Sequence, residues 1–164
     1  MATVRQYLTP EEAQFLATAF PQLDKINGTN FPVVVLKYDA ASIETAFWHR
    51  QLMGYGSGNI TCDVAWYADT ASSGTVQWDA GIAAITPDTD TQDVETKAFA
   101  TVSSVTDTHL GTTGQRLHLA SVVISNLDSV AAGDQVWIKI SRNTSDSMAG
   151  DACFVSARLS YSDT

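Results

Sequence analysis

The chain has 164 residues, of which 45% are hydrophobic and 16% charged, and it carries a formal net charge of −9. This length predicts one domain that buries a core without disulfide or metal staples, and the composition excludes a disordered chain. Binding to DNA or to anionic membranes needs a cationic surface, so the nine basic residues, scattered from Arg5 to Arg158, argue against both partners.

The first thirty residues are expected to form an N-terminal arm, a short helix and a loop. Residues 1–8 are assigned to the arm because their apolar residues follow no period. Thr9, Pro10 and Glu12 then match an N-cap, a first helical position and a capping box. Apolar residues at helical spacing follow as far as Phe20. We therefore expect one short amphipathic helix whose apolar face needs a cover.

From residue 31 to the C-terminus, segments typical of β-strands alternate with clusters of Gly, Asn, Asp, Ser and Thr. Eight strands are predicted, at residues 32–38, 45–51, 59–67, 76–85, 97–105, 115–125, 135–142 and 153–161. Apolar and polar residues alternate in several of them, as half-buried antiparallel strands require. The spacing predicts an all-β domain over residues 31–164, an antiparallel β-sandwich or barrel.

One predicted strand breaks the alternation. Leu117 and Leu119 alternate with polar residues, whereas residues 122–124 form a continuous apolar run. A β-bulge shifts the phase of a strand by one residue. We therefore expect a bulge near Ala120 and Ser121.

Two cysteines, Cys62 and Cys153, lie far apart in the sequence and inside predicted strands. We interpret them as reduced thiols that pack as small apolar side chains, and leave open whether they pair. Residues 1–8 lack a basic stretch followed by an apolar run, so no signal peptide is expected.

No catalytic constellation stands out, so the chain is not expected to be an enzyme or to need a cofactor. The candidate metal ligands are the alternating carboxylates Asp88, Asp90 and Asp93, since Ca²⁺ takes several oxygen ligands. Asp93, however, stands where an EF-hand loop needs glycine. A solvated acidic loop is therefore the favoured interpretation, with a contact for a basic partner as the alternative, and no metal is assigned.

The position of a tryptophan in the apolar and polar alternation of its strand predicts whether it is buried or exposed. Trp66 and Trp78 lie in mid-strand among apolar neighbours, which predicts core positions. Trp137 is out of phase with Val136 and Ile138, so it is expected to be exposed. Exposed aromatic side chains often mark interfaces.

Several short stretches of the sequence also carry a family resemblance. They are Phe47-Trp48, residues 54–58, 62–68, 74–78 and 132–142, and Asp151-Ala152 followed by a closing strand that ends at Tyr161. Together, across residues 46–161, they resemble small β-sandwich structural proteins of tailed bacteriophages. That group includes capsid decoration (cement) proteins and related head or tail accessory proteins.

This resemblance implies a jelly-roll-like, non-enzymatic virion protein. It would assemble in the host bacterial cytoplasm, form a homotrimer on the outer capsid surface, and bind and bridge the major capsid protein. The residues expected to contact the shell or a sister subunit are Val4, Tyr7, Leu8, Phe15, Leu16, Phe20 and Trp137.

Two further hypotheses remain open. The second hypothesis is a carbohydrate-binding module or a tail-tip receptor-binding protein, in which Trp137 and Tyr55 would stack on sugar rings. A secreted or lectin-like enzyme accessory is the third hypothesis, and the expected absence of a signal peptide disfavours it.

Overall fold

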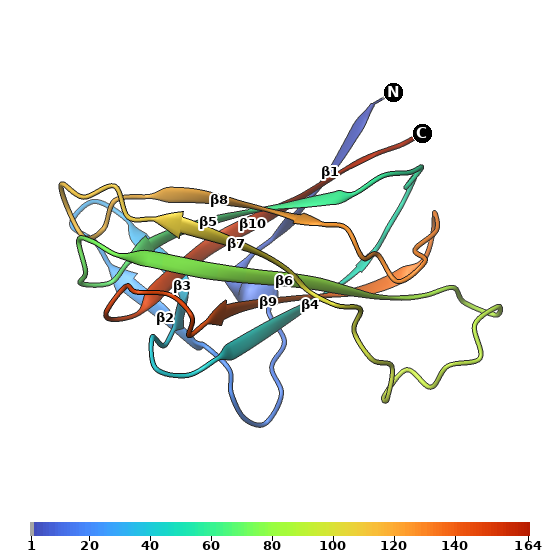
Figure 1. Cartoon of the computed structure of the whole chain (residues 1–164), viewed down its shortest axis with the longest axis horizontal. Helices are drawn as coiled ribbons and strands as arrows, with labels where there is room; N and C mark the ends of the chain where they lie inside the picture. The colour runs from blue at the N-terminus through green and yellow to red at the C-terminus, as the bar shows by residue number, and fades with distance from the viewer. Residues whose placement is uncertain (1) are drawn as a thin grey trace.

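The computed structural model describes residues 2–164 and consists of two antiparallel β-sheets packed face to face (Figure 1). In the larger sheet the strand order is β2 (Gln22–Asn27), β3 (Pro32–Tyr38), β10 (Ala152–Ser162), β5 (Ile60–Ala68), β8 (His118–Ile124), and β1 (Thr3–Leu8) also pairs with β10. In the smaller sheet the order is β4 (Glu44–Gln51), β9 (Gln135–Asn143), β6 (Thr75–Ile85), β7 (Ser103–Thr108). The predicted all-β antiparallel sandwich is confirmed.

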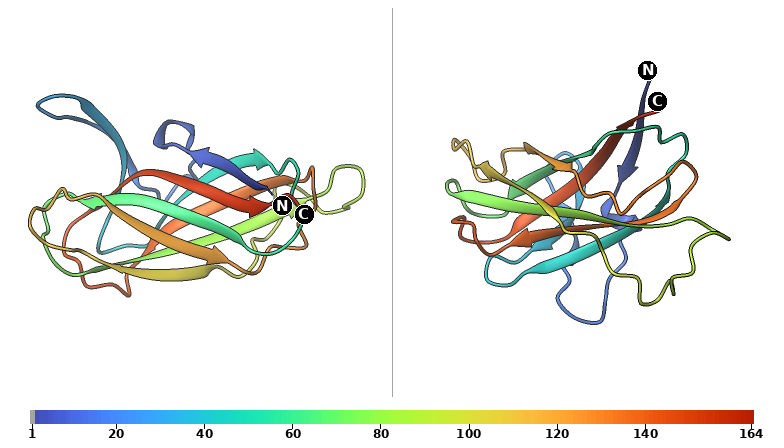
Figure 2. Two further views of the ribbon diagram at one scale, coloured as in Figure 1. Left: turned by 90° about the horizontal axis from the view of Figure 1, so that it is seen from above. Right: turned by 45° about the vertical axis from the view of Figure 1, so that its right-hand side comes forward.

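The segment predicted to be an arm is a strand of the larger sheet. β1 pairs with β10 over six residues, from Thr3 opposite Ser162 to Leu8 opposite Ala157. Leu8 is fully buried in the core. β2 was also unforeseen and forms a hairpin with β3 that projects from the body of the sandwich, as Figure 2 shows.

The predicted amphipathic helix is wrong, because only a single 3₁₀ turn, η1 (Pro10–Glu12), forms. The carboxylate of Glu12 accepts a hydrogen bond from Arg50 Nη2 of β4 at 2.6 Å. Gln14 then exchanges two backbone hydrogen bonds with Phe47 of β4, at 2.8 and 3.0 Å. Pairing with the edge of β4 therefore replaces the helix that the local capping pattern favours. Within residues 2–164, no helix is long and apolar enough to cross a membrane.

Two details of the predicted strands also differ. The strand expected at residues 97–105 is displaced to β7, which leaves a seventeen-residue loop, residues 86–102, after β6. The bulge expected near Ala120 is absent, since β8 pairs with β5 without a shift and Leu119 is simply exposed. The register shift of the larger sheet lies in β10, between Phe154 and Ser156.

The core between the sheets is built around three tryptophans. Trp48, Trp66 and Trp78 are all fully buried, which confirms the core positions predicted for Trp66 and Trp78. Tyr38 packs edge-on against Trp78 with ring centroids 5.2 Å apart, and its hydroxyl donates to the carbonyl of Ile140 at 3.1 Å. Such edge-to-face pairs add to the free energy of burying the rings.

Cys62 and Cys153 are free thiols on opposite faces of the larger sheet. Cys62 faces the main core, whereas Cys153 packs with Val35 and Tyr67 on the outer face. This separation excludes a disulfide between them. Burial raises the pKa of both thiols to about 12, so both remain protonated and unreactive at neutral pH.

A fully buried arginine ties the loop after β9 to the sandwich. Arg142 contacts both carboxylate oxygens of Asp146, at 2.8 and 3.1 Å. Its remaining N–H groups donate to the carbonyls of Tyr38, Met148 and Gly150. The guanidinium is thus paired and hydrogen-bonded throughout, the condition under which a buried charge is tolerated.

Substitutions at two adjacent residues of β1 test whether this segment is a core strand or a free arm. Leu8→Ala removes a fully buried side chain and should lower the free energy of unfolding by about 2–5 kcal/mol. Tyr7→Ala, on the opposite face of the same strand and 59% exposed, should cost less than about 1 kcal/mol. Urea unfolding followed by circular dichroism measures both, and equal small losses would contradict a structural role for β1.

The Arg142 network gives a second stability prediction. Arg142→Leu leaves the Asp146 carboxylate buried without its partner and should cost about 3–5 kcal/mol. Arg5→Leu, at an exposed position of β1, is the matched control and should change stability by less than about 0.5 kcal/mol. A loss at Arg142 no larger than the loss at Arg5 in urea unfolding refutes the interpretation.

Candidate functional site

The candidate site lies on the outer face of the smaller sheet, where β9 is flanked by β4 and β6. Val136, Ile138 and Ile140 of β9 are buried in the core, so Trp137 and Lys139 must face outward. Strand register places these two side chains in rows with residues of the neighbouring strands. The row of Trp137 contains His49 and Ala83, and the row of Lys139 contains Phe47 and Gly81.

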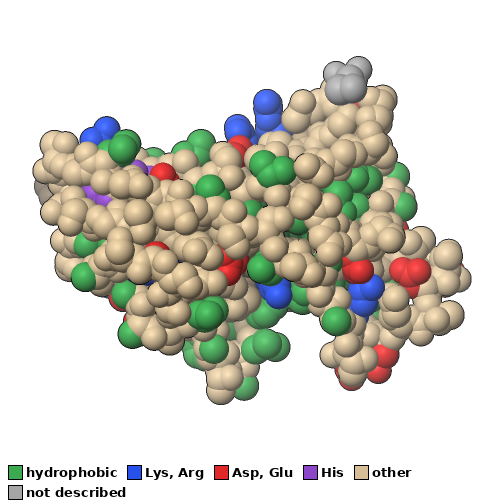
Figure 3. Space-filling view, in the orientation of Figure 1, with side chains coloured by type: hydrophobic (Ala, Val, Ile, Leu, Met, Phe, Trp, Pro, Cys, Tyr) green, Lys and Arg blue, Asp and Glu red, His purple; other side chains and the backbone are tan. Residues whose placement is uncertain are grey.

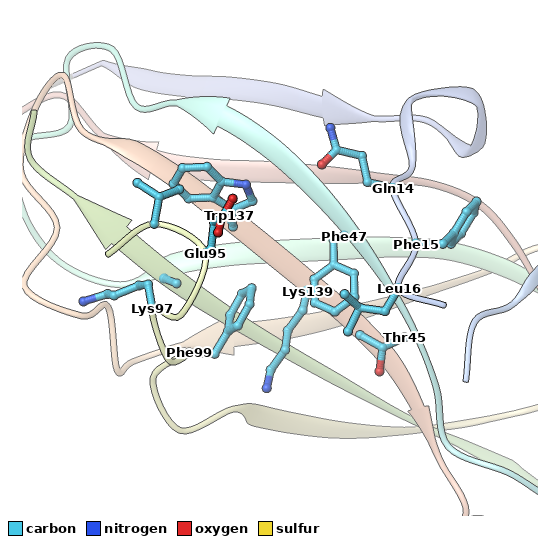
Figure 4. A pocket seen from close by; sticks show the side chains of 12 residues that line it. Gln14, Phe15, Leu16, Thr45, Phe47, Glu95, Lys97, Phe99, Trp137 and Lys139 are labelled. Atoms are coloured by element: carbon cyan, nitrogen blue, oxygen red, sulfur yellow. The ribbon is translucent and has the colours of Figure 1, made fainter. Parts of the chain in front are cut away.

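Two loops raise walls around this face and turn it into a groove of about 520 Å³ (Figure 4). One wall is the segment that follows η1 and carries Gln14, Phe15 and Leu16. The other is the long loop of residues 86–102, and Figure 3 shows a hollow beside the lobe that this loop forms at the lower right. The volume is within the range of small-molecule binding sites.

The second wall is held in place at its C-terminal end. Lys97 pairs with Asp128 at 2.9 Å, and its ammonium also donates to Gln92 Oε1 at 2.9 Å. The backbone N–H of Ala100 donates to the carbonyl of Ile82 at 3.0 Å. These contacts fix the part of the loop that presents Lys97 and Phe99 to the groove.

The floor of the groove is aromatic. Trp137, Phe47 and Phe99 are each partly exposed, and the Phe47 and Phe99 ring centroids lie 5.7 Å apart. His49 stacks on Trp137 with centroids 4.7 Å apart and an angle of 28° between the rings. This stacking holds the indole in one orientation, so the groove offers a preformed apolar surface to a ligand.

Polar groups stand around this floor. Thr45 shares a hydrogen bond of 2.9 Å with Ser141, and Gln14 and Glu95 are exposed at the rims. Burial lowers the pKa of the Lys139 ammonium, and the negative charge of Asp79 partly opposes that shift. An apolar floor with a few polar side chains at its edges suits a ligand that has a flat apolar face and polar substituents.

The groove has few side chains with an acidic or hydroxyl group. Among the residues that line it in the described structure, Glu95 is the single carboxylate. Glycoside hydrolysis uses two carboxyl groups on either side of the scissile bond. Thr45 is the single hydroxyl side chain in the lining, and its partner is Ser141 rather than a base.

The residues predicted to form an interface are scattered over the structure. Phe15, Leu16 and Trp137 line the groove, and Phe20 packs on Phe15 with centroids 5.6 Å apart. The three residues of β1 lie elsewhere: Leu8 in the core, Val4 partly buried against it, and Tyr7 exposed on the outer face of the larger sheet. Leu8 is therefore out of reach of any partner.

The proposed sugar-stacking role of Tyr55 does not fit its position. Its ring packs on Tyr161 with centroids 5.9 Å apart, and its hydroxyl donates to the carbonyl of Gly58 at 2.7 Å. Tyr55 does not line the groove. It closes the turn before β5.

The acidic loop has no arrangement of metal ligands. Asp90 accepts a hydrogen bond from the backbone N–H of Thr86 at 2.8 Å, and Asp93 accepts one from that of Glu95 at 2.9 Å. Within residues 2–164, neither Asp88 nor any other acidic residue, histidine or cysteine belongs to a group of three that could hold a metal ion. These aspartates instead shape the turns of the second wall.

Of the residues that line the groove, the sequence predicted Phe15, Leu16 and Trp137 as interface residues and missed the others. Phe47 and Lys139 both lie in correctly predicted strands, and their outward phase was readable from the buried residues beside them. Phe99 was assigned to a strand rather than to the loop that carries it over the sheet. Nothing in the local sequence marks the pairing of Gln14 with β4 that builds the first wall.

Comparison with known proteins gives a match of fold. No protein-family model and no curated protein matches the chain. Among solved structures, a carbohydrate-binding module specific for non-crystalline cellulose (CBM28) aligns with a TM-score of 0.56 and 6% identity, covering 93% of this chain and 89% of its own.

Two other carbohydrate-binding modules align less well. A CBM36 module in complex with calcium and xylotriose has a TM-score of 0.48 and 15% identity, with 94% of this chain and 98% of that one covered. The module CBM27-1 of Caldicellulosiruptor saccharolyticus, in complex with mannohexaose, has a TM-score of 0.44 and 6% identity, with 94% and 96% covered.

These findings correct the functional expectation drawn from the sequence. The expectation of a capsid decoration protein is wrong, because the fold matches that of a carbohydrate-binding module, the CBM28 structure, over 93% of the chain. Part of its structural basis also fails, since the arm is a paired strand and the helix does not form. The β-sandwich component of the resemblance is retained.

The geometry of the groove predicts a single solvent-accessible tryptophan. Trp48, Trp66 and Trp78 are fully buried and only Trp137 is partly exposed, so iodide should quench one of the four fluorophores. Trp137→Phe should abolish the quenchable fraction and leave the unfolding midpoint nearly unchanged. Trp66→Phe is the control, and it should keep the quenchable fraction. Quenching that survives in the Trp137 variant would contradict this assignment.

Proposed function

We propose that the chain is a non-catalytic carbohydrate-binding protein that holds a glycan in the groove on the outer face of the smaller sheet. The observation that carries the proposal is the aromatic floor made by Trp137, Phe47 and Phe99 between two walls. The fold match to a cellulose-specific module agrees with the proposal. At 6% identity it says nothing about which sugar is bound.

Sugar rings match the chemistry of this groove. The axial C–H groups of a pyranose form an apolar face that packs on an aromatic ring, and its hydroxyl groups lie around the rim of that face. Trp137 and Phe47 supply the flat apolar surface. Gln14, Glu95 and Thr45 supply donors and acceptors at the edges. Because Trp137 and Phe47 are held on β9 and β4, little conformational entropy is lost when a ligand binds.

The walls define which part of a glycan is held. The groove lies along the sheet surface between the Gln14 segment and the loop of residues 86–102, as Figure 4 shows. We infer that it takes an internal stretch or an end of a single soluble chain rather than the flat surface of a crystal. An array of stacked chains would collide with the walls.

The proposal is tested by isothermal titration calorimetry and tryptophan fluorescence against soluble neutral and acidic polysaccharides. Trp137→Ala should weaken binding about fivefold, since loss of one stacked ring costs on the order of 1 kcal/mol. Phe47→Ala should act in the same direction. Trp137 emission should also change on binding, because it is the exposed indole.

Tyr7→Ala is the matched control for these variants. Tyr7 is an exposed aromatic residue on the outer face of the other sheet, so its removal should leave affinity unchanged. Failure of the wild-type chain to bind any member of the panel overturns the proposal. So does an equal loss of affinity in the Tyr7 and Trp137 variants.

A further inference from the structure

One basic side chain in the groove differs from all others in the described part of the chain. Five of the nine Lys and Arg residues are paired with carboxylates: Lys37, Arg50, Lys97, Arg142 and Arg158. Three of the other four, Arg5, Lys25 and Arg116, are exposed to solvent. Lys139 is the one that is partly buried and has no ion-pair partner.

The groove is built around the stem of Lys139. Gly81 lies opposite it on β6, and a Cβ at position 81 would approach Lys139 Cε to 3.2 Å. The absence of that Cβ gives the stem room to lie against the sheet. At its end, Nζ lies 4.9 Å from the centroid of the Phe99 ring. The ammonium is therefore presented beside the aromatic floor.

Within residues 2–164, the Lys139 ammonium forms no ion pair with a carboxylate. The negative charge of Asp79 acts on this ammonium from beyond ion-pair distance, and the Asp79 oxygens accept hydrogen bonds from the neutral side chains of Gln77 and Asn143. The neighbouring Lys97 is neutralised by Asp128. A partly desolvated cation is costly unless an anion approaches it, so a negatively charged ligand group is stabilised at this point.

Charge is also distributed unevenly along the groove. Figure 4 shows Glu95 beside Trp137, whereas the ammonium of Lys139 lies away from that ring, near Phe99. Trp137 and Lys139 are two residues apart on one face of β9, a separation of about 7 Å. A ligand that stacks on Trp137 and carries an acidic group thus has one favourable direction, with the acid toward Lys139 and away from Glu95.

We propose that the groove selects acidic glycans, in which a uronic acid carboxylate forms a charge-assisted hydrogen bond with Lys139 Nζ while a sugar ring stacks on the aromatic floor. This inference rests on the proposed function and adds the class of ligand to it. Recognition comes from a local charge, because the protein as a whole carries a net charge of −9 and repels anions at long range.

The test compares two ligands with the same sugar backbone, trigalacturonate and its methyl ester, in which methylation of the carboxylates removes their charge. Calorimetry at about 0.15 M salt keeps the rest of the acidic surface screened beyond about 8 Å. The wild-type chain should bind the acid about tenfold more tightly than the ester. Lys139→Gln should remove this preference and leave the affinity for the ester unchanged.

Lys25→Gln is the matched control, since Lys25 is an unpaired and exposed lysine on β2. It should keep the full preference for the acid. Near-ultraviolet circular dichroism of the Lys139 variant verifies that the groove remains folded. A third ligand, a sulfated galactan oligosaccharide, distinguishes a carboxylate from a sulfate ester.

The outcomes separate this inference from the proposed function. Equal affinity for acid and ester, a preference that survives in Lys139→Gln, or binding of the sulfated ligand alone overturns the inference. In each case, binding to any glycan of the panel leaves the proposed function standing. Absence of binding to every glycan overturns both.

Discussion

The alternation of β9 between core and surface is the constraint on which the rest of the molecule depends. β9 lies between β4 and β6, and its residues Val136, Ile138 and Ile140 must enter the core because no other strand fills that space. The residues of β9 that alternate with these three therefore face outward, which puts Trp137 and Lys139 on one surface. A shift of one residue in the pairing register of β9 would bury Lys139 and expose three branched apolar side chains. Packing of the core therefore maintains the register that positions Trp137 and Lys139 in the groove.

The groove needs walls as well as a floor, and the walls depend on contacts between distant parts of the chain. Arg50 holds Glu12 on one side, and Lys97 holds Asp128 on the other. Each pair joins a loop to a strand or loop that is remote in sequence. Partly exposed ion pairs of this kind stabilise a protein little, but they restrict where a loop rests. Loops of this length without regular structure are uncommon unless they serve a function.

The distribution of charge links the fold to the proposed specificity. Most basic side chains of this acidic chain form ion pairs with carboxylates. The buried Arg142 is the extreme case, because all of its N–H groups donate to Asp146 or to a backbone carbonyl. Lys139 is left unpaired in a groove lined by aromatic rings. A surface that is acidic overall and basic at one enclosed point favours discrimination between similar ligands over strong nonspecific attraction.

The sequence by itself determined seven of the eight predicted strands, the outward phase of Trp137 and the buried phase of Trp66 and Trp78, because period-two alternation is a local property of the chain. It did not predict β1 or β2. The sequence did not determine which segments of the chain pair with one another. A capping pattern favoured a helix after Thr9, yet pairing of Gln14 with Phe47 produced an extended wall. Only the tertiary structure brought Phe99 over Lys139 and placed Leu8 in the core, since such contacts join residues far apart in the chain and their free energy exceeds local preference.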